Sequence, residues 1–326
     1  MPNEKIHPQQ PKVFARRLKR AKTALLGLGF LGVSVGGLVY FFPLELRALW
    51  IRSTLWADGV SEVRVDGIQG FQRDHCVQGQ PCNCVALLHG LGDDALTWTK
   101  LLKAPRERWQ APVRLVAWNL PGVGESERPQ ERAGFRAQLQ AEKMGTVLEK
   151  FSAECSHWLV AGNSFGGWVA GWMAVSSPKI SRLLLLDAAG LPMNDVVTRW
   201  HSTFWNDPTV EGLQELQRRA YFKPRVLSPR VWRAATKRVR DSVAHEVAAA
   251  QTEADFLSSH LNEIHAPTLL IWGKSDHLVP IEVGEGFKKI AGSDLRVIPD
   301  CGHLPQKECP EAVVDGIHAL LSFGAM

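Results

Sequence analysis

The sequence predicts an α/β fold in which a mostly parallel sheet carries helices on both faces. Short apolar runs recur along the chain, and stretches of helical composition separate them. Strands of a sheet that is covered on both faces are expected to be nearly continuous apolar runs. The length of 326 residues suffices for one large domain or two small ones. With 45% hydrophobic and 22% charged residues, the composition excludes a disordered chain.

The apolar runs give the expected strands, which lie at residues 85–90, 113–122, 157–164, 182–190, 267–273 and 295–303. Helices are expected between them, for example over 135–151 and 166–178. These elements make up a core over residues 60–190 and 263–326. The interval 191–262 breaks the alternation, because it is helical in composition and too long for an ordinary connection. We predict that 191–262 is a helical cap over the carboxyl edge of the sheet, where open α/β sheets bind ligands.

The first part of the chain predicts an N-terminal transmembrane helix. Residues 23–44 contain no charged side chain, and about 20 helical residues span the roughly 30 Å of a bilayer's hydrocarbon core. Six Lys or Arg residues precede this segment between positions 12 and 22. The positive-inside rule therefore predicts a cytoplasmic basic tail over 1–22 and an extracytoplasmic, periplasmic remainder of a single-pass membrane protein.

Two alternatives remain open for this region. A cleaved signal peptide is the competing interpretation of the apolar run, although Tyr-Phe-Phe-Pro at its end is a poor cleavage site. The linker over residues 45–59 is apolar and amphipathic. We expect it to form an interfacial helix that lies along the membrane or packs against the domain.

Charge and cysteine content exclude several classes of function. The net charge of +5 is concentrated in the tail and in 218–240, without a zinc-finger, RNA-recognition or helix-turn-helix pattern, so no nucleic-acid partner is expected. Cys82 and Cys84 lack metal-ligand spacing and have no histidine close by, so neither a metal nor another cofactor is predicted. A disulfide among Cys76, Cys82 and Cys84 and free buried thiols remain alternatives. The sequence leaves the oligomeric state open.

The segment Gly162-Asn163-Ser164-Phe165-Gly166 fits G-x-S-x-G and lies between an expected strand and an expected helix. A sharp strand-to-helix turn at this position strains the serine backbone, and small residues on either side let the turn close. The turn also places the Ser164 hydroxyl at a helix N-terminus, where the helix dipole favours developing negative charge. Ser164 is therefore the predicted nucleophile.

A serine hydroxyl needs a base to take its proton, and the base needs an orienting acid. Asp276 follows the expected strand at 267–273, and His303 follows the one at 295–303, in the chain order Ser, Asp, His. We predict that Asp276 is the acid and His303 the base. Asp187, which directly follows the apolar run RLLLL at 182–186, is the alternative acid. His89 is interpreted as structural.

Acyl transfer also needs hydrogen-bond donors for the negatively charged oxygen of the tetrahedral intermediate. The backbone N–H of Phe165, which follows the nucleophile, is one expected donor. The backbone N–H of Leu91, in the loop after the His-Gly pair, is the other.

In their order along the chain, LLHGLGDDALTW, NLPGVGES, AGNSFGGWVA, LLIWGKSDHLVP and PDCGHLP resemble motifs of α/β-hydrolase-fold enzymes. The resemblance covers roughly residues 60–322. The N-terminal segment and LLLLDAAGL look most like membrane-bound monoacylglycerol lipases and bacterial lipases or esterases. The match assigns the nucleophile to Ser164, the acid to Asp276 and the base to His303. One departure is Asn119, which stands where many members have Asp before Leu-Pro-Gly.

This resemblance implies a serine hydrolase that cleaves carboxylic esters, with lipid-like esters such as monoacylglycerols as substrates and the bilayer as a partner. The G-N-S-x-G-G form also resembles hydrolases that cleave carbon–carbon bonds of ring-fission products, which is the alternative enzymatic function. A non-catalytic binding member of the fold is the alternative from another class. Aromatic cap residues suit an acyl chain or the cap's own core: Trp200, Trp205, Tyr221, Phe222 and Trp232.

Overall fold

The computed structural model describes residues 43–79, 82–151, 155 and 157–322. Contacts divide the chain into two units, Met1–Thr54 and Leu55–Met326. Apart from its last two residues, the predicted transmembrane segment at 23–44 lies outside the described residues. Within the described part, no helix has both the length and the apolar composition needed to cross a membrane. The segment expected as an interfacial helix forms α3 (Pro43–Ala57), which begins two residues before the predicted boundary.

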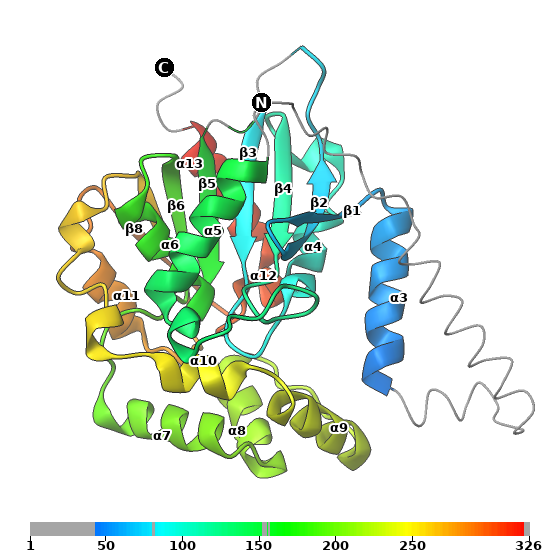
Figure 1. The fold of residues 1–326 in the computed structure, drawn as a ribbon, viewed down its shortest axis with the longest axis vertical. Helices are drawn as coiled ribbons and strands as arrows, with labels where there is room; N and C mark the ends of the chain where they lie inside the picture. The colour runs from blue at the N-terminus through cyan, green and yellow to red at the C-terminus, as the bar shows by residue number, and fades with distance from the viewer. Residues whose placement is uncertain (1–42, 80–81, 152–154, 156, 323–326) are drawn as a thin grey trace, which may run out of the picture. The chain divides into compact units, whose positions relative to one another are not determined.

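Eight strands form one sheet in the order β1-β2-β4-β3-β5-β6-β7-β8 (Figure 1). The six strands expected from the sequence are β3 (Asn83–Leu88), β4 (Val113–Trp118), β5 (Trp158–Asn163), β6 (Ile180–Leu186), β7 (Thr268–Gly273) and β8 (Asp294–Ile298). They run parallel to one another, which confirms the predicted mostly parallel sheet. Every residue of β5 and β7 is buried, because helices cover both faces.

The first two strands were not expected from the sequence. β1 (Ser61–Val65) and β2 (Ile68–Asp74) form an antiparallel hairpin, and β2 continues the sheet by pairing with β4. Asp66 and Gly67 join the two strands with φ angles of 48° and 77°. Two positive φ angles are the requirement of a type I′ hairpin turn, which Asp-Gly favours. The Asp-Gly pair between two short strands was therefore the available signal.

Helices pack on both faces of the sheet. They are α4 (Thr99–Leu102), α5 (Ala137–Phe151), α6 (Phe165–Ser176), α11 (Ile281–Phe287), α12 (Pro305–Glu308) and α13 (Pro310–Ser322). In Figure 1, α5 and α6 lie in front of the strands and α13 lies behind them. Short 3₁₀ turns occur at Ala95–Trp98, Arg106–Arg108, Arg132–Phe135, Glu253–Asp255 and Leu261–Glu263.

Four more helices occupy the interval that was expected to form a cap. They are α7 (Asp195–Asn206), α8 (Val210–Ala220), α9 (Pro229–Arg240) and α10 (Ala244–Ala250). Asn194, Thr209 and Ser228 begin the first three, and each side-chain oxygen accepts a hydrogen bond from a first-turn amide. The helices lie beyond the edge at which the parallel strands end (Figure 1).

The last part of the predicted cap interval, at the 3₁₀ turn Glu253–Asp255, is hydrogen-bonded to the helix that follows the predicted nucleophile. The indole N–H groups of Trp168 and Trp172, both on α6, donate to the Asp255 carbonyl at 2.6 and 2.7 Å. The Asp255 carboxylate is buried and accepts two hydrogen bonds from Arg136. Buried polar groups require such partners, so these bonds fix the return of the chain from the cap to the core.

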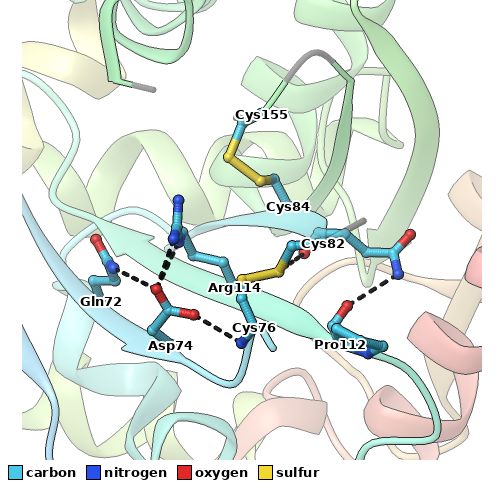
Figure 2. Close-up of a disulfide and its surroundings, with 9 residues drawn as sticks. Gln72, Asp74, Cys76, Cys82, Cys84, Pro112, Arg114 and Cys155 are labelled. Carbon is cyan, nitrogen blue, oxygen red and sulfur yellow. Dashed lines mark hydrogen bonds and ion pairs between the residues drawn. A yellow bond between two sulfur atoms is a disulfide. The ribbon is translucent and has the colours of Figure 1, made fainter. Parts of the chain in front are cut away.

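All six cysteines pair, as Cys76–Cys82, Cys84–Cys155 and Cys301–Cys309. The alternative of free buried thiols is therefore wrong. The alternative of a disulfide among Cys76, Cys82 and Cys84 is confirmed by Cys76–Cys82, whereas Cys84 bonds to Cys155. Its partner lies nearby because Cys84 in β3 pairs in register with Trp158 of β5, close after Cys155. Figure 2 shows Cys76–Cys82 and Cys84–Cys155. The Asp74 carboxylate, drawn in the same view, accepts hydrogen bonds from the Arg114 guanidinium and the Cys76 amide.

Removing Cys84–Cys155 is expected to destabilise the protein more than removing Cys76–Cys82. The separations are 71 and 6 residues, and the chain-entropy model then gives losses of about 4 and about 2 kcal/mol. Urea denaturation of Cys84→Ala/Cys155→Ala and Cys76→Ala/Cys82→Ala, each purified with the other disulfides intact, measures the two losses. Equal losses would contradict the expected order.

Candidate active site

Ser164 occupies a sharp turn between β5 and α6, with φ and ψ angles of 54° and −120°. A positive φ angle strains a residue that has a Cβ atom. The turn closes because its flanks are glycines: a Cβ on Gly162 would lie 2.2 Å from the Gly166 carbonyl oxygen. A Cβ on Gly166 would lie 2.4 Å from the Leu88 carbonyl oxygen of β3. The motif therefore produces the strained turn that was expected from it.

His303 and Asp276 form a buried hydrogen-bonded pair, with 2.7 Å between His303 Nδ1 and Asp276 Oδ2. Asp276 Oδ1 accepts from the amides of Leu278 and Val279 at 2.7 and 3.0 Å. Because Nδ1 donates to the carboxylate, Nε2 is left to accept a proton. Ser164 and His303 line the same cavity, so the fold brings the three residues together from the ends of β5, β7 and β8.

The two amides expected to bind an oxyanion lie at the same cavity. Leu91 and Phe165 both line it, and a Cβ on Gly90 would lie 3.1 Å from the Ser164 Cβ. Within the described part of the chain, neither the Leu91 nor the Phe165 amide donates a hydrogen bond. Two unused N–H groups beside the serine are the arrangement that stabilises a tetrahedral oxyanion.

Both ring nitrogens of His89 make hydrogen bonds to the backbone around the loop that follows β3. Nδ1 lies 2.8 Å from the Gly90 carbonyl oxygen, and Nε2 accepts from the Leu120 amide at 3.1 Å. Burial lowers the pKa of His89, so the ring is neutral. These contacts agree with its interpretation as a structural residue.

Asn119 supports the same loop. Its Oδ1 accepts from the Ala95 amide at 2.7 Å, and its Nδ2 donates to Gln69 Oε1 at 2.7 Å. An aspartate could accept the first bond but could not donate the second one. The departure at position 119 therefore matches the local hydrogen bonding around Gln69.

Asp187, the alternative acid, is fully buried at the end of β6 and makes no hydrogen bond to His303. Its Oδ1 accepts from the Gly273 amide at 2.8 Å, whereas its Oδ2 has no donor among the described residues. One of its oxygens lies within 4.8 Å of an Asp276 carboxylate oxygen and of a ring nitrogen of His303. Burial, followed by the adjacent Asp276 charge, raises the pKa of Asp187 well above its usual value.

Two carboxylates in such a buried cluster cannot both be ionised. Asp276 receives three hydrogen bonds, whereas Asp187 receives one, so the charge belongs on Asp276 and the proton on Asp187. A proton on Asp187 turns its contact with Asp276 into a hydrogen bond. Asp276, and not Asp187, is therefore the carboxylate that faces the predicted base.

Two residues near the pair were not recognised from the sequence. Asn163, inside the G-x-S-x-G segment, donates from Nδ2 to the His303 carbonyl at 2.8 Å and so ties the base loop to the strained turn. His201 of α7 contacts the Leu278 carbonyl at 3.0 Å through Nε2. The position of Asn163 beside the serine was a usable signal, whereas nothing in the sequence distinguishes His201.

The cavity over Ser164 has a volume of about 550 Å³ and extends beneath the cap helices. Apolar side chains make up much of its wall, including Trp168, Met193, Leu213, Leu216, Val239 and Phe256. Of the cap aromatics expected to face an acyl chain, Trp205, Tyr221 and Trp232 line the cavity. Trp200 instead stacks on Phe204, and the Arg219 guanidinium lies 4.8 Å from the centre of the Trp200 ring.

Two clusters in the described chain come close enough to hold a metal ion: Asp74 with Cys76 and Cys82, and Asp187 with Asp276 and His303. Both thiols of the first cluster are consumed by a disulfide. The second cluster uses its His303 nitrogen and Asp276 oxygen in the hydrogen bond described above. Neither arrangement indicates a metal centre.

Comparison with known proteins places this geometry among hydrolases. Residues 85–316 match a model described as the Alpha/beta hydrolase family. A 2-hydroxy-6-oxononadienedioate/2-hydroxy-6-oxononatrienedioate hydrolase from Klebsiella pneumoniae subsp. pneumoniae is 29% identical over 239 residues, covering 69% of this chain and 82% of that protein.

Solved structures with a similar fold include a phospholipase and a lipase. A membrane phospholipase A, called a novel bacterial virulence factor, has a TM-score of 0.69 and 26% identity, covering 92% of this chain and 98% of that one. A putative lipase from Acinetobacter baumannii AYE has a TM-score of 0.67, with coverage of 83% and 95%. Its identity of 20% makes this second likeness one of fold alone.

Substitution of the two aspartates is expected to separate their roles. Asp276→Asn should lower kcat about 10⁴-fold, because the base loses its orienting charge. Asp187→Asn retains a donor toward Asp276 and should leave kcat within about threefold. Assays with a soluble ester measure both. A comparable loss in Asp187→Asn would contradict the assignment of the charge to Asp276.

The same pair predicts a pH dependence of stability. The pKa of Asp187 is raised in the folded state, so its contribution is present below the unfolded pKa and is lost as pH rises. Above pH of about 4, wild-type stability should fall relative to Asp187→Asn by up to about 1.4 kcal/mol per pH unit. Urea denaturation of both proteins between pH 5 and 8 measures the difference. A difference independent of pH would mean that Asp187 is ionised.

Proposed function

The chain belongs to the alpha/beta hydrolase family, and from this premise we propose that it is a serine hydrolase that cleaves carboxylic esters through an acyl-enzyme on Ser164. One observation carries the proposal. Ser164, with its strained backbone, and His303, which is paired with buried Asp276, line one cavity beside two backbone amides that have no acceptor among the described residues. A binding protein of the same fold would not require this strain or these unused donors, which argues against a non-catalytic role.

In the proposed reaction, Ser164 Oγ attacks the ester carbonyl carbon while His303 Nε2 takes the hydroxyl proton. The Asp276 carboxylate stabilises the resulting imidazolium. The Leu91 and Phe165 amides donate to the oxyanion, each lowering the barrier by about 3 kcal/mol. The intermediate then collapses, the alcohol leaves with the proton from His303, and an acyl-Ser164 ester remains. Water attacks this ester by the same steps in reverse and releases the carboxylic acid.

The cavity favours lipid-like esters such as monoacylglycerols. Its aromatic and aliphatic wall can bury an acyl chain, and its volume of about 550 Å³ suits a small lipid. The relative solved as a membrane phospholipase A agrees with this substrate class.

Hydrolysis of a carbon–carbon bond is the second candidate, favoured by the Klebsiella relative, whose named substrates are dicarboxylates. Such a dianion needs positive charge in its pocket. Among the described residues that line the cavity, Lys307 is the only Lys or Arg, and it is paired with Asp93. An ester without carboxylates fits this wall better than a dicarboxylate does.

The disulfides support a location outside the cytoplasm. Three disulfides that use all six cysteines are expected in an oxidising compartment. Combined with the predicted anchor at 23–44 and its basic flank, they support a catalytic unit that faces the periplasm or an equivalent compartment beside a membrane. Substrate drawn from that membrane would suit the apolar cavity.

Labelling with a fluorophosphonate probe tests the nucleophile. Wild type should be labelled, and Ser164→Ala should not, because the probe bonds only to an activated serine. His303→Ala should label at least about 10³-fold more slowly, whereas His277→Ala, in the neighbouring strand-end loop, is the matched control and should label normally. Absence of labelling in folded wild type would refute the proposal. Turnover of dienedioates with no turnover of any acyl ester would favour the second candidate.

A further inference from the structure

A single ion pair interrupts the apolar wall of the cavity. Lys307 Nζ lies 2.6 Å from Asp93 Oδ2, and both residues line the cavity. Within the described part of the wall, they are the only Lys or Arg and the only Asp or Glu. The two positions are 214 residues apart, so the fold alone creates the pair.

Both members of the pair are charged. Burial opposes the ammonium form, but the Asp93 charge and hydrogen bond outweigh it and raise the pKa of Lys307 above its ordinary value. Burial likewise opposes the Asp93 carboxylate, but the Lys307 ammonium holds the pKa of Asp93 below its usual range. A charge pair of this kind in an apolar pocket loses hydration, and an apolar pair of similar volume is often as stable. Stability alone therefore does not account for it.

The pair also has unused hydrogen-bonding capacity. Of the three ammonium N–H groups of Lys307, one is used by Asp93, and no other described residue accepts from the ammonium. The Asp93 carboxylate accepts from Lys307, from the Asp94 amide and from the Thr97 side chain, which still leaves a lone pair available. The side chains are 30% exposed for Lys307 and 25% for Asp93, so a ligand in the cavity can reach them.

The position of the pair relates it to the leaving alcohol. Asp93 follows the loop that carries the Leu91 amide, and Lys307 lies in α12, four residues after His303. In ester cleavage the departing oxygen takes its proton from the base, so the alcohol lies on the His303 side of the serine. The polar pair thus lies on the two segments that also carry one predicted oxyanion amide and the predicted base.

We infer that Asp93 and Lys307 form a subsite for a leaving alcohol that carries further hydroxyl groups, such as the glycerol of a monoacylglycerol. The Lys307 ammonium donates to one hydroxyl oxygen, and the Asp93 carboxylate accepts from a hydroxyl. A polyol fits because the pair has no net charge. A phosphate-bearing alcohol would bring two or more negative oxygens against Asp93 without an uncompensated cation. This inference rests on the proposed ester hydrolase function and names its alcohol.

The experiment compares two esters of the same fatty acid, a 1-monoacylglycerol and an ethyl ester, in wild type and in Asp93→Asn/Lys307→Met. The double change avoids leaving one buried charge unpaired. Loss of two or so hydrogen bonds to the polyol should lower kcat/KM for the monoacylglycerol about 10- to 100-fold. The ethyl ester should change by less than about threefold, since its alcohol has no second hydroxyl.

Control measurements distinguish a structural role of the Asp93–Lys307 pair from a role in substrate specificity. Lys100→Met removes a lysine that donates to the Lys307 carbonyl from outside the cavity, and it should leave the ratio of the two kcat/KM values unchanged. Thermal unfolding and the rate of fluorophosphonate labelling report whether the double variant retains its fold and triad.

Equal losses on both esters would overturn the subsite, because they would indicate a general structural role. A wild-type preference for a 1-acylglycerol 3-phosphate over the monoacylglycerol would also overturn it. Failure of wild type to hydrolyse any ester or to label would instead refute the proposed function, so the two failures are distinguishable.

Discussion

The close approach of three backbone segments around Ser164 is the constraint on which the rest of the site depends. The end of β5, the start of α6 and the end of β3 touch at Gly162, Gly166 and Leu88, and no Cβ atom fits at either glycine. This contact forces the serine into a positive φ angle and leaves the first amide of α6 without an acceptor. The strained backbone of Ser164 is held in place because its carbonyl oxygen accepts hydrogen bonds from the amides of Gly167, Trp168 and Ala189.

The base loop is held from two sides, by the strained turn and by the cap. Asn163 donates to the His303 carbonyl, and the His303 amide donates to the Ala220 carbonyl at the end of α8. The Glu308 carboxylate accepts from the amides of Gly302 and Phe222, which adds a second bond between the loop and the cap. The cap therefore shapes the cavity and also fixes the position of the predicted base.

Burial affects the protonation of two pairs of adjacent side chains in different ways. Asp187 and Asp276 have the same sign when ionised, and a proton on Asp187 removes the repulsion. Asp93 and Lys307 have opposite signs, and each keeps the other charged inside an apolar wall. The first pair leaves one carboxylate to orient His303, and the second places the only Lys/Arg and Asp/Glu side chains among the described residues that line the cavity.

By itself, the sequence determined the parallel strands, the turn at Ser164 and the identities of Asp276 and His303 as candidates, because strand periodicity and short motifs are local properties of the chain. Asp66-Gly67 was an equally local signal for the first hairpin, although it was not used. Only the tertiary structure decided the Cys84–Cys155 bond, the protonation of Asp187 and the Asp93–Lys307 pair. Each of these depends on which segments distant in the sequence come into contact and on how deeply their side chains are buried. Neither property can be read from the local spacing of residues along the chain.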